Sequence, residues 1–249
     1  MDTKGGSYGK SNRIEALDAL RGVSILFVVF YHLIYDLIYY KGFNIPFFYS
    51  KAFGIVHSVF LAVLFLVSGC CASFSRDVIK RGAILAVLGE AITVATAIFS
   101  PENLIVFGVL SFFGISMILY GLISPALQKI PWAIVLVTAA ALWFALRDFG
   151  SGRINLIFTE LHFNLPRNRD YLYPFGITSP TFRSADYFPL IPTFFIFLFG
   201  TALSKPIKSN QFPKSFYTLK APVISFIGRH SLLIYLVHQP LLLFILLYI

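Results

Sequence analysis

Residues 16–40 read ALDALRGVSILFVVFYHLIYDLIYY, an apolar stretch that also carries Asp18, Arg21, His32 and Asp36. A helix needs about 20 such residues to cross a bilayer. At about 100° per residue, Asp18 and Asp36 point the same way, with Arg21 about 60° and His32 about 40° to one side. An ionised group that faces lipid costs about 2.5–3.5 kcal/mol. We therefore expect this polar face to lie inside a helix bundle or against a wet cavity.

The rest of the chain has the composition of a membrane protein. Of its 249 residues 57% are hydrophobic and only 12% are charged, and the mean hydropathy is +0.79. Such values are far from those of soluble domains. Apolar runs occur at 16–40, 55–73, 82–99, 104–123, 131–147, 188–203 and 223–249. We therefore predict an all-α integral membrane protein, a bundle of about seven transmembrane helices that forms a single domain over residues 1–249.

Residues 148–187 form the longest non-apolar segment and are rich in Pro, Tyr, Arg and Asp. A connection of that length is usually functional or disordered. Its aromatic residues favour an ordered lid on the external side of the bundle.

The Lys and Arg residues set the expected orientation. With seven helices, one side receives eleven of them and the other side receives seven. The richer side carries Lys4, Lys10, Arg13, Arg76, Lys80, Arg81, Lys129, Lys205, Lys208, Lys214 and Lys220. Cytoplasmic loops hold the excess of positive charge. We therefore expect the N-terminus in the cytoplasm and the C-terminus outside. As a separate expectation, we place the protein in the plasma membrane of a prokaryote. The net charge of +9 then needs no nucleic acid to explain it.

Acid–base chemistry is the first functional hypothesis for the polar face. An imidazole titrates near neutrality, so His32 can take a proton from an attacking hydroxyl or amine. Asp36 follows one turn later and could orient the ring. The alternative is purely structural, with Arg21 neutralised by Asp18 and His32 by Asp36.

The last apolar run carries a second candidate, His238. Seven residues separate it from Ser231, so the two share a helix face, and we expect Pro240 to bend the helix. His238 could serve the substrate or bond a neighbouring helix. Arg229, expected lower in the same helix and on its opposite face, could bind an anion or serve packing. His57, at the start of the second run, could reach the chemistry or be an interfacial residue.

Arg76, Lys80 and Arg81 form a cationic cluster after the second run. They could hold phosphates of an acyl-carrying nucleotide or simply mark the cytoplasmic side. The two cysteines, Cys70 and Cys71, are adjacent and indicate neither a disulfide nor a metal site. The sequence contains no Gly-rich phosphate loop and neither His-Glu-x-x-His nor Gly-x-Ser-x-Gly. We expect no bound metal, no nucleotide hydrolysis and no metal-dependent proteolysis.

Several motifs together resemble those of the heparan-alpha-glucosaminide N-acetyltransferase catalytic-domain-like family, within the wider transmembrane acyltransferases. In chain order they are RIEALDALRG at 13–22, FYH at 30–32, YDL at 35–37, FLVSG at 65–69, IVFGVL at 105–110, DYFPLIP at 186–192, GRHS at 228–231 and YLVHQP at 235–240. The opening is also similar to the acyltransferase-3 family, in which the corresponding Arg and His are essential.

The resemblance implies transfer of an acyl group, usually acetyl from cytoplasmic acetyl-CoA, to an amine or hydroxyl of an extracytoplasmic sugar or glycan. Arg21, Arg76, Lys80, Arg81 and Arg229 would face the donor, while His32, Asp36, His238 and His57 would face the acceptor. In the lysosomal member of the family an Asn stands at the position of His32, and His57 does not reproduce the spacing of its reactive His. We therefore expect direct attack with His32 as the base.

Two other functions remain open from the sequence. Buried Asp, Arg and His also mark the ion pathways of proton- or ion-coupled transporters, although two matching Gly- or Pro-broken helices, typical of repeat-built transporters, are not found here. The charges could also only fix helix pairing in a scaffold subunit. The acceptor, the choice between N- and O-transfer, and the formation of a homo-oligomer are left open.

Overall fold

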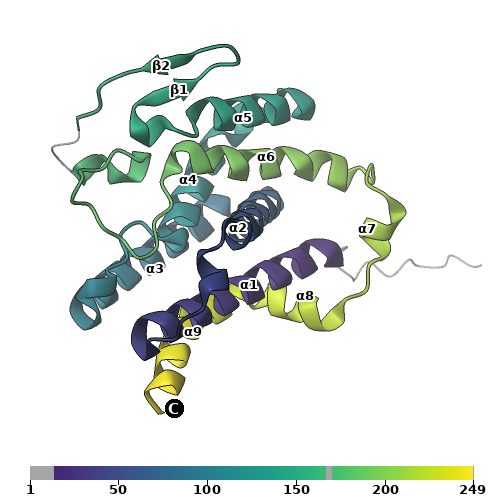
Figure 1. Cartoon of the computed structure of the whole chain (residues 1–249). Helices are drawn as coiled ribbons and strands as arrows, with labels where there is room; N and C mark the ends of the chain where they lie inside the picture. The colour runs from purple at the N-terminus through teal and green to yellow at the C-terminus, as the bar shows by residue number, and fades with distance from the viewer. Residues whose placement is uncertain (1–13, 167–169, 249) are drawn as a thin grey trace, which may run out of the picture. The chain divides into compact units, whose positions relative to one another are not determined.

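The structure, a computed structural model, describes residues 14–166 and 170–248 (Figure 1). Lys4, Lys10, Arg13, Arg167 and Arg169, which entered the charge count, lie outside the described residues. Helices dominate the fold. The α-helices are α1 (Glu15–Lys41), α2 (Lys51–Ala72), α3 (Val78–Phe99), α4 (Val109–Leu127), α5 (Trp132–Leu146), α6 (Leu190–Lys208), α7 (Lys214–Thr218), α8 (Pro222–Arg229) and α9 (Ser231–Tyr248). The short elements are η1 (Pro46–Tyr49), η2 (Pro101–Asn103), η3 (Phe149–Ser151), β1 (Arg153–Asn155), β2 (Glu160–His162) and η4 (Asp170–Phe175).

The all-α membrane architecture is confirmed. Within the described residues, six helices are long and apolar enough to cross a bilayer, and α8 and α9 pass the same test as a bent pair. The spans agree closely with the apolar runs, because a run of that length has few alternatives to a helix in lipid. Residues 14–166 and 170–248 therefore contain six candidate spans, or seven if the bent pair counts as one.

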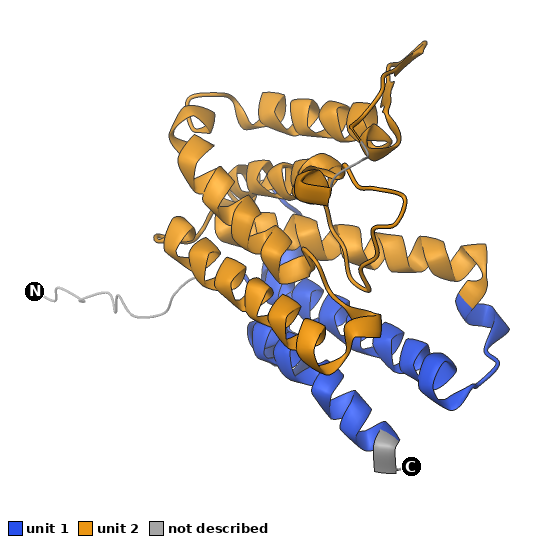
Figure 2. Cartoon of the chain, turned by 90° about the vertical axis from the view of Figure 1, so that its left-hand side faces the viewer, with its two compact units in different colours: residues 1–48, 212–249 blue, residues 49–211 orange. Residues whose placement is uncertain are grey.

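The chain divides into two compact units, which Figure 2 colours separately. Unit 1 combines residues 1–48 with residues 212–249, so that both ends of the chain contribute to it. Unit 2 comprises residues 49–211. Of the candidate residues, Arg21, His32, Asp36, Arg229 and His238 belong to unit 1. The others, His57, Arg76, Lys80 and Arg81, belong to unit 2.

Unit 1 is held together by close packing of α1 against α8. A Cβ atom at Gly22 would overlap the carbonyl oxygen of Ile224, and one at Gly228 would overlap that of Asp18. The two backbones can approach this closely only because glycine stands at both positions, as is common where membrane helices pack. At the start of α8, the Glu15 carboxylate accepts a hydrogen bond from the Ala221 N–H at 3.1 Å. The contact positions the polar face of α1 against the C-terminal segment.

The last apolar run is broken where we did not predict it. We expected a bend at Pro240, but α9 continues through that residue. The break lies at His230, where α8 and α9 meet at an angle of 79°. Arg229 therefore ends a separate helix and does not lie lower in the helix of His238. The break was not predicted because apolar residues lie on both sides of it, at 222–227 and 232–237, whereas proline removes only one backbone N–H and a helix can tolerate that.

Unit 2 is built from three helix pairs, α2 with α6, α3 with α4 and α5 with α6. Its core is aromatic, with the Phe65 ring 5.0 Å from that of Phe112 and 5.2 Å from that of Phe188. Phe112 and Phe197 are fully buried. A core of this kind gains from edge-to-face contacts between rings in addition to its buried area.

Residues 184–188 pack along the start of α4. Asp186 accepts a hydrogen bond from the Val109 N–H at 3.2 Å, and the Ala185 N–H donates to the Leu104 carbonyl at 2.9 Å. A carboxylate at a helix N-terminus satisfies an unpaired N–H and interacts favourably with the helix dipole. Two motifs that carried the family resemblance, 105–110 and 186–192, thus meet in one contact.

The segment at 148–187 is ordered in its described residues. It contains η3, a two-stranded antiparallel hairpin of β1 and β2, and η4. The Tyr187 hydroxyl donates to the Tyr173 carbonyl at 2.5 Å. Burial, together with the negative charge of Asp170, raises the pKa of Tyr187 to about 12. This tyrosine is therefore a permanent hydrogen-bond donor that ties the segment to itself.

Candidate functional site

His32 on α1 and His238 on α9 meet within unit 1. Their ring centroids are 5.1 Å apart and the ring planes are inclined by 61°. Tyr31 packs edge-on against His32 at 5.7 Å, and Tyr235 lies 5.3 Å from His238. The structure therefore brings together the two histidines that the sequence analysis assigned to the acceptor.

The hydrogen bond of His238 defines its tautomer. Its Nδ1 lies 2.6 Å from the Tyr235 carbonyl oxygen. A carbonyl oxygen can only accept, so we assign the proton to Nδ1 and the lone pair to Nε2. Nε2 is buried and has no hydrogen-bond partner among the described residues. The ring thus has a basic nitrogen directed into the protein, the state that a proton acceptor requires.

Asp36 is the most deeply buried charged residue of the site, with no exposed surface. Both of its carboxylate oxygens accept from Gln239 Nε2, each at 3.0 Å. We expected Asp36 to orient His32, but its hydrogen bonds go to the residue that follows His238. Sequence reasoning missed Gln239, although a polar side chain within an apolar helix is a recognised signal for contacts between helices. The bond fixes α1 against α9 beside the two imidazoles.

A second polar group lies towards the start of α1. Arg21 Nη2 donates to Ser231 Oγ at 2.7 Å, and its Nη1 lies 4.0 Å from Asp18 Oδ1. The Asp18 side chain is almost fully buried and that of Arg21 is 24% exposed. As expected, the carboxylates at 18 and 36 both lie inside the protein. The guanidinium is held between helices, yet it keeps part of its surface open.

The remaining cationic candidates are exposed. Arg76, Lys80 and Arg81 lie between α2 and the first turn of α3. Arg229 is also exposed, at the end of α8, with its guanidinium 5.9 Å from the Phe226 ring centroid. Exposed cations at helix ends are available to bind phosphate.

His57, by contrast, lies in the second turn of α2 and is partly buried. Among the histidine candidates, only His32 and His238 lie together within one unit.

Two glycine-containing motifs that carried the family resemblance, 13–22 and 228–231, lie beside Asp18 and Arg21. Gly22 and Gly228 set the approach of α1 to α8 next to Arg21 and Asp18. Ser225 Oγ, fully buried on α8, donates to the Glu15 carbonyl at 3.2 Å. Close helix contact and polar hydrogen bonds together hold the group of Asp18, Arg21 and Ser231 in place.

A family model described as "Heparan-alpha-glucosaminide N-acetyltransferase, catalytic" matches residues 13–240. The matched region includes every candidate residue, together with Gln239, and ends at Pro240. No curated protein and no solved structure matches the chain.

Proposed function

Because the chain belongs to the family of the heparan-alpha-glucosaminide N-acetyltransferase catalytic region, we propose that it transfers an acetyl group across the membrane. The donor is cytoplasmic acetyl-CoA and the acceptor is an amine or hydroxyl of an extracytoplasmic sugar or glycan. Membership of the family indicates a membrane acetyltransferase. The proposal adds the donor, the acceptor and the residues that act on them.

The contact between His32 and His238 is the observation that carries this proposal. We assign the general base to His32, because it is partly exposed whereas His238 is 7% exposed. His238 then acts as the neighbouring ring that positions His32. Its Nδ1 is committed to the Tyr235 carbonyl, so its orientation is fixed by the backbone of α9.

In the proposed reaction, the acceptor's N–H or O–H gives its proton to His32 as the nitrogen or oxygen attacks the thioester carbonyl. A new C–N or C–O bond forms and the C–S bond breaks. The CoA thiolate leaves and is protonated by the imidazolium, which restores the neutral base. A positioned base of this kind contributes about 10²–10⁴ in rate.

The cations serve the donor in this proposal. Arg21, Arg76, Lys80, Arg81 and Arg229 would bind the phosphates of CoA through charge-assisted hydrogen bonds. The N-terminus would lie in the cytoplasm, in accordance with the excess of Lys and Arg in the loops on that side. The plasma membrane of a prokaryote is the proposed location.

A proton- or ion-coupled transporter is the second candidate, and the burial of Asp18 and Asp36 within a membrane-spanning helix favours it. Intramembrane carboxylates are frequent in ion pathways. Ligand binding distinguishes the two functions. An acetyltransferase is stabilised by its donor even without an acceptor.

Thermal unfolding of the purified protein with acetyl-CoA, CoA or sodium ions tests the choice. A ligand present at about 100 times its Kd stabilises the folded state by about 2.7 kcal/mol. We expect acetyl-CoA and CoA to raise the unfolding temperature and desulfo-CoA, which keeps the phosphates, to do the same. Stabilisation by sodium alone, with no effect of either CoA species, would favour the transporter.

A further inference from the structure

The hairpin of β1 and β2 has an unusual turn. Its strands pair Arg153 with His162 and Asn155 with Glu160, and the Leu156 N–H donates to the Thr159 carbonyl at 2.8 Å. Tight turns in water favour Gly, Pro, Asn, Asp and Ser. Here the turn reads Leu-Ile-Phe-Thr, with Ile157 83% and Phe158 97% exposed. Three consecutive apolar residues are thus presented at the tip of a hairpin.

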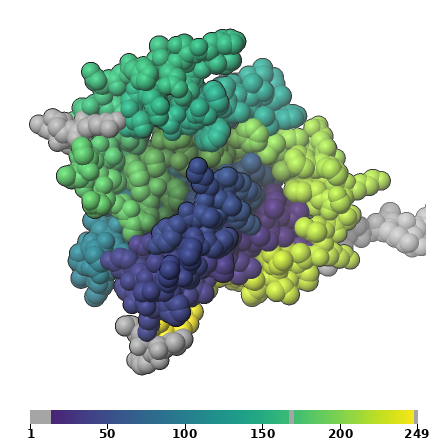
Figure 3. Space-filling model, viewed as in Figure 1, coloured from purple at the N-terminus to yellow at the C-terminus, as the bar shows by residue number. Residues whose placement is uncertain are grey.

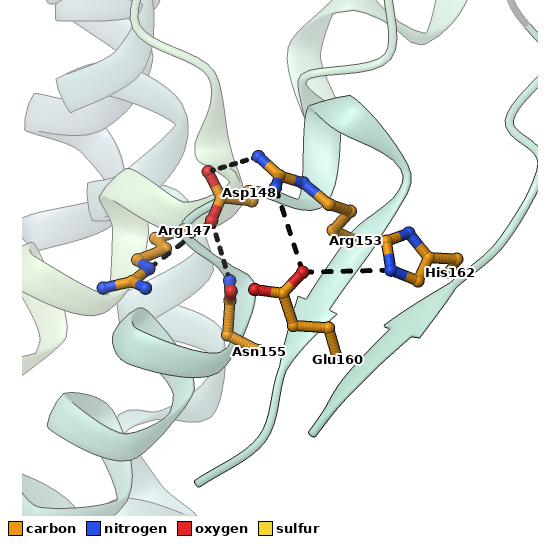
Figure 4. Close-up of polar contacts among 6 residues, drawn as sticks. All are labelled: Arg147, Asp148, Arg153, Asn155, Glu160 and His162. Carbon is orange, nitrogen blue, oxygen red and sulfur yellow. Dashed lines mark hydrogen bonds and ion pairs between the residues drawn. The ribbon is translucent and has the colours of Figure 1, made fainter. Parts of the chain in front are cut away.

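The base of the hairpin is fixed, as Figure 4 shows. Arg153 lies 3.6 Å from Asp148 and 3.9 Å from Glu160. Asn155 Nδ2 donates to Asp148 Oδ2 at 2.9 Å, and Arg147 lies 3.4 Å from the same carboxylate. Asp148 lies two residues after the end of α5. The network therefore links the base of the hairpin to the end of a membrane-spanning helix.

The neighbouring surface of α5 indicates what the tip contacts. Val137 is 64% exposed, and Trp143 and Phe144 are also exposed. The Arg147 guanidinium lies 4.6 Å from the Phe144 ring centroid. Trp and Arg near the end of a span are typical of the boundary between hydrocarbon and water. Figure 3 shows the surface of the hairpin continuing into that of α5.

We propose that Leu156, Ile157 and Phe158 insert into the lipid leaflet beside the end of α5, as a membrane contact separate from the spans. The hairpin begins within a few residues of the boundary that Trp143 and Arg147 mark, and two short strands span about 10 Å. The apolar tip is thus within reach of the bilayer, while the charged base stays at the headgroups. An exposed apolar patch next to a membrane-spanning helix is typical of a membrane contact.

Single-tryptophan variants in bilayers test the proposal. The background carries Trp132→Phe and Trp143→Phe, and into it are placed Phe158→Trp at the tip, His162→Trp at the base and Val137→Trp on α5. His162 is 69% exposed, so it is the control from the same hairpin. Emission is recorded in proteoliposomes of ordinary and of brominated phosphatidylcholine. A tip buried in lipid gives F158W a blue-shifted emission and quenching close to that of V137W and stronger than that of H162W.

Three outcomes would overturn the proposal. The first is F158W emission at the wavelength of water-exposed tryptophan, quenched no more than that of H162W. The second is protection of F158W from aqueous iodide without quenching by brominated lipid, which would indicate a protein partner instead. The third is the failure of Ile157→Trp, a second reporter at the tip, to reproduce the behaviour of F158W. The unfolding temperature of each variant, compared with the background, verifies that the fold is retained.

Discussion

At the residue scale, the two polar groups of α1 differ in their chemistry. Arg21 donates to Ser231 on α9 and lies close to Asp18 on its own helix, an arrangement that pairs opposite charges within α1. Around His32 and His238 the bonds leave one nitrogen, His238 Nε2, with a lone pair and no partner among the described residues. Buried polar atoms are nearly always satisfied. His238 Nε2 therefore has unused capacity to accept a proton.

The bond between Gln239 and Asp36 is testable through stability. Gln239→Leu removes the amide group that donates hydrogen bonds to both carboxylate oxygens of Asp36. Because Asp36 is fully buried, we expect the free energy of unfolding to fall by about 1.5–3 kcal/mol, the contribution of a hydrogen bond to a charged group. Thermal unfolding in detergent micelles provides the measurement.

Gln128→Leu is the matched control, since Gln128 is exposed at the end of α4. A surface change of this kind usually stays within about 0.5 kcal/mol. Equal losses in Q239L and Q128L would show that the bond to Asp36 contributes nothing.

Among single residues, the sequence predicted the polar face and the two histidines but not their bonding partners. Asp18 and Asp36 recur at helical spacing, which is visible in one run of sequence. Gln239 and Ser231 act on residues about two hundred positions earlier in the chain. Such a contact depends on how α9 packs against α1, and helical periodicity does not encode it.

At the element scale, the packing of α1 on α8 positions the group of Asp18, Arg21 and Ser231. It depends on glycine at 22 and at 228, where a side chain would meet backbone of the other helix. Backbone atoms cannot rotate away as a flexible side chain can. A methyl group at either position must therefore move one helix.

We expect Gly22→Ala and Gly228→Ala each to destabilise the protein by about 1–3 kcal/mol, the usual cost of overpacking. Gly54→Ala is the control, because a Cβ at Gly54 on α2 has no atom within 4 Å. In that open position alanine favours the helix by about 0.5–1 kcal/mol. The measurement is the unfolding temperature of the three variants under identical conditions. The packing account fails if G22A is as stable as G54A.

The elements themselves were largely predictable, with two exceptions. Long apolar runs gave the six spans because lipid leaves the backbone few options other than a helix. The break at His230 escaped prediction, since the residues on both sides are apolar enough to continue a span. The hairpin escaped it too, because strands of three residues carry almost no periodic signal.

At the scale of the whole molecule, we expect the charges to be arranged by side of the membrane. The predicted cytoplasmic side carries the cluster Arg76, Lys80 and Arg81, and all three side chains are exposed. Positive charge on that side is expected in any membrane protein. A measurement of CoA binding therefore decides whether these three residues bind the donor or only reflect the orientation of the chain in the membrane.

Arg76→Gln and Lys80→Gln should each weaken CoA binding by about tenfold, the effect of losing one charge-assisted contact to a phosphate. Calorimetric titration of CoA into the purified protein measures the affinity. Arg183→Gln is the control, because Arg183 is exposed in the segment that we predict to lie outside the cell. Unchanged affinity in the cluster variants, or an equal loss in R183Q, would contradict the assignment.

The central claim is that the chain moves an acetyl group from acetyl-CoA with His32 as the base. The most direct test supplies radiolabelled acetyl-CoA to membranes of cells that make the wild-type protein or His32→Ala, and follows label into the glycan and lipid-linked sugar fractions. We predict labelled product with the wild type and a rate lower by about 10²–10⁴ with H32A, at equal amounts of inserted protein. Equal labelling by H32A and the wild type, or no label above that of membranes without the protein, would contradict the account.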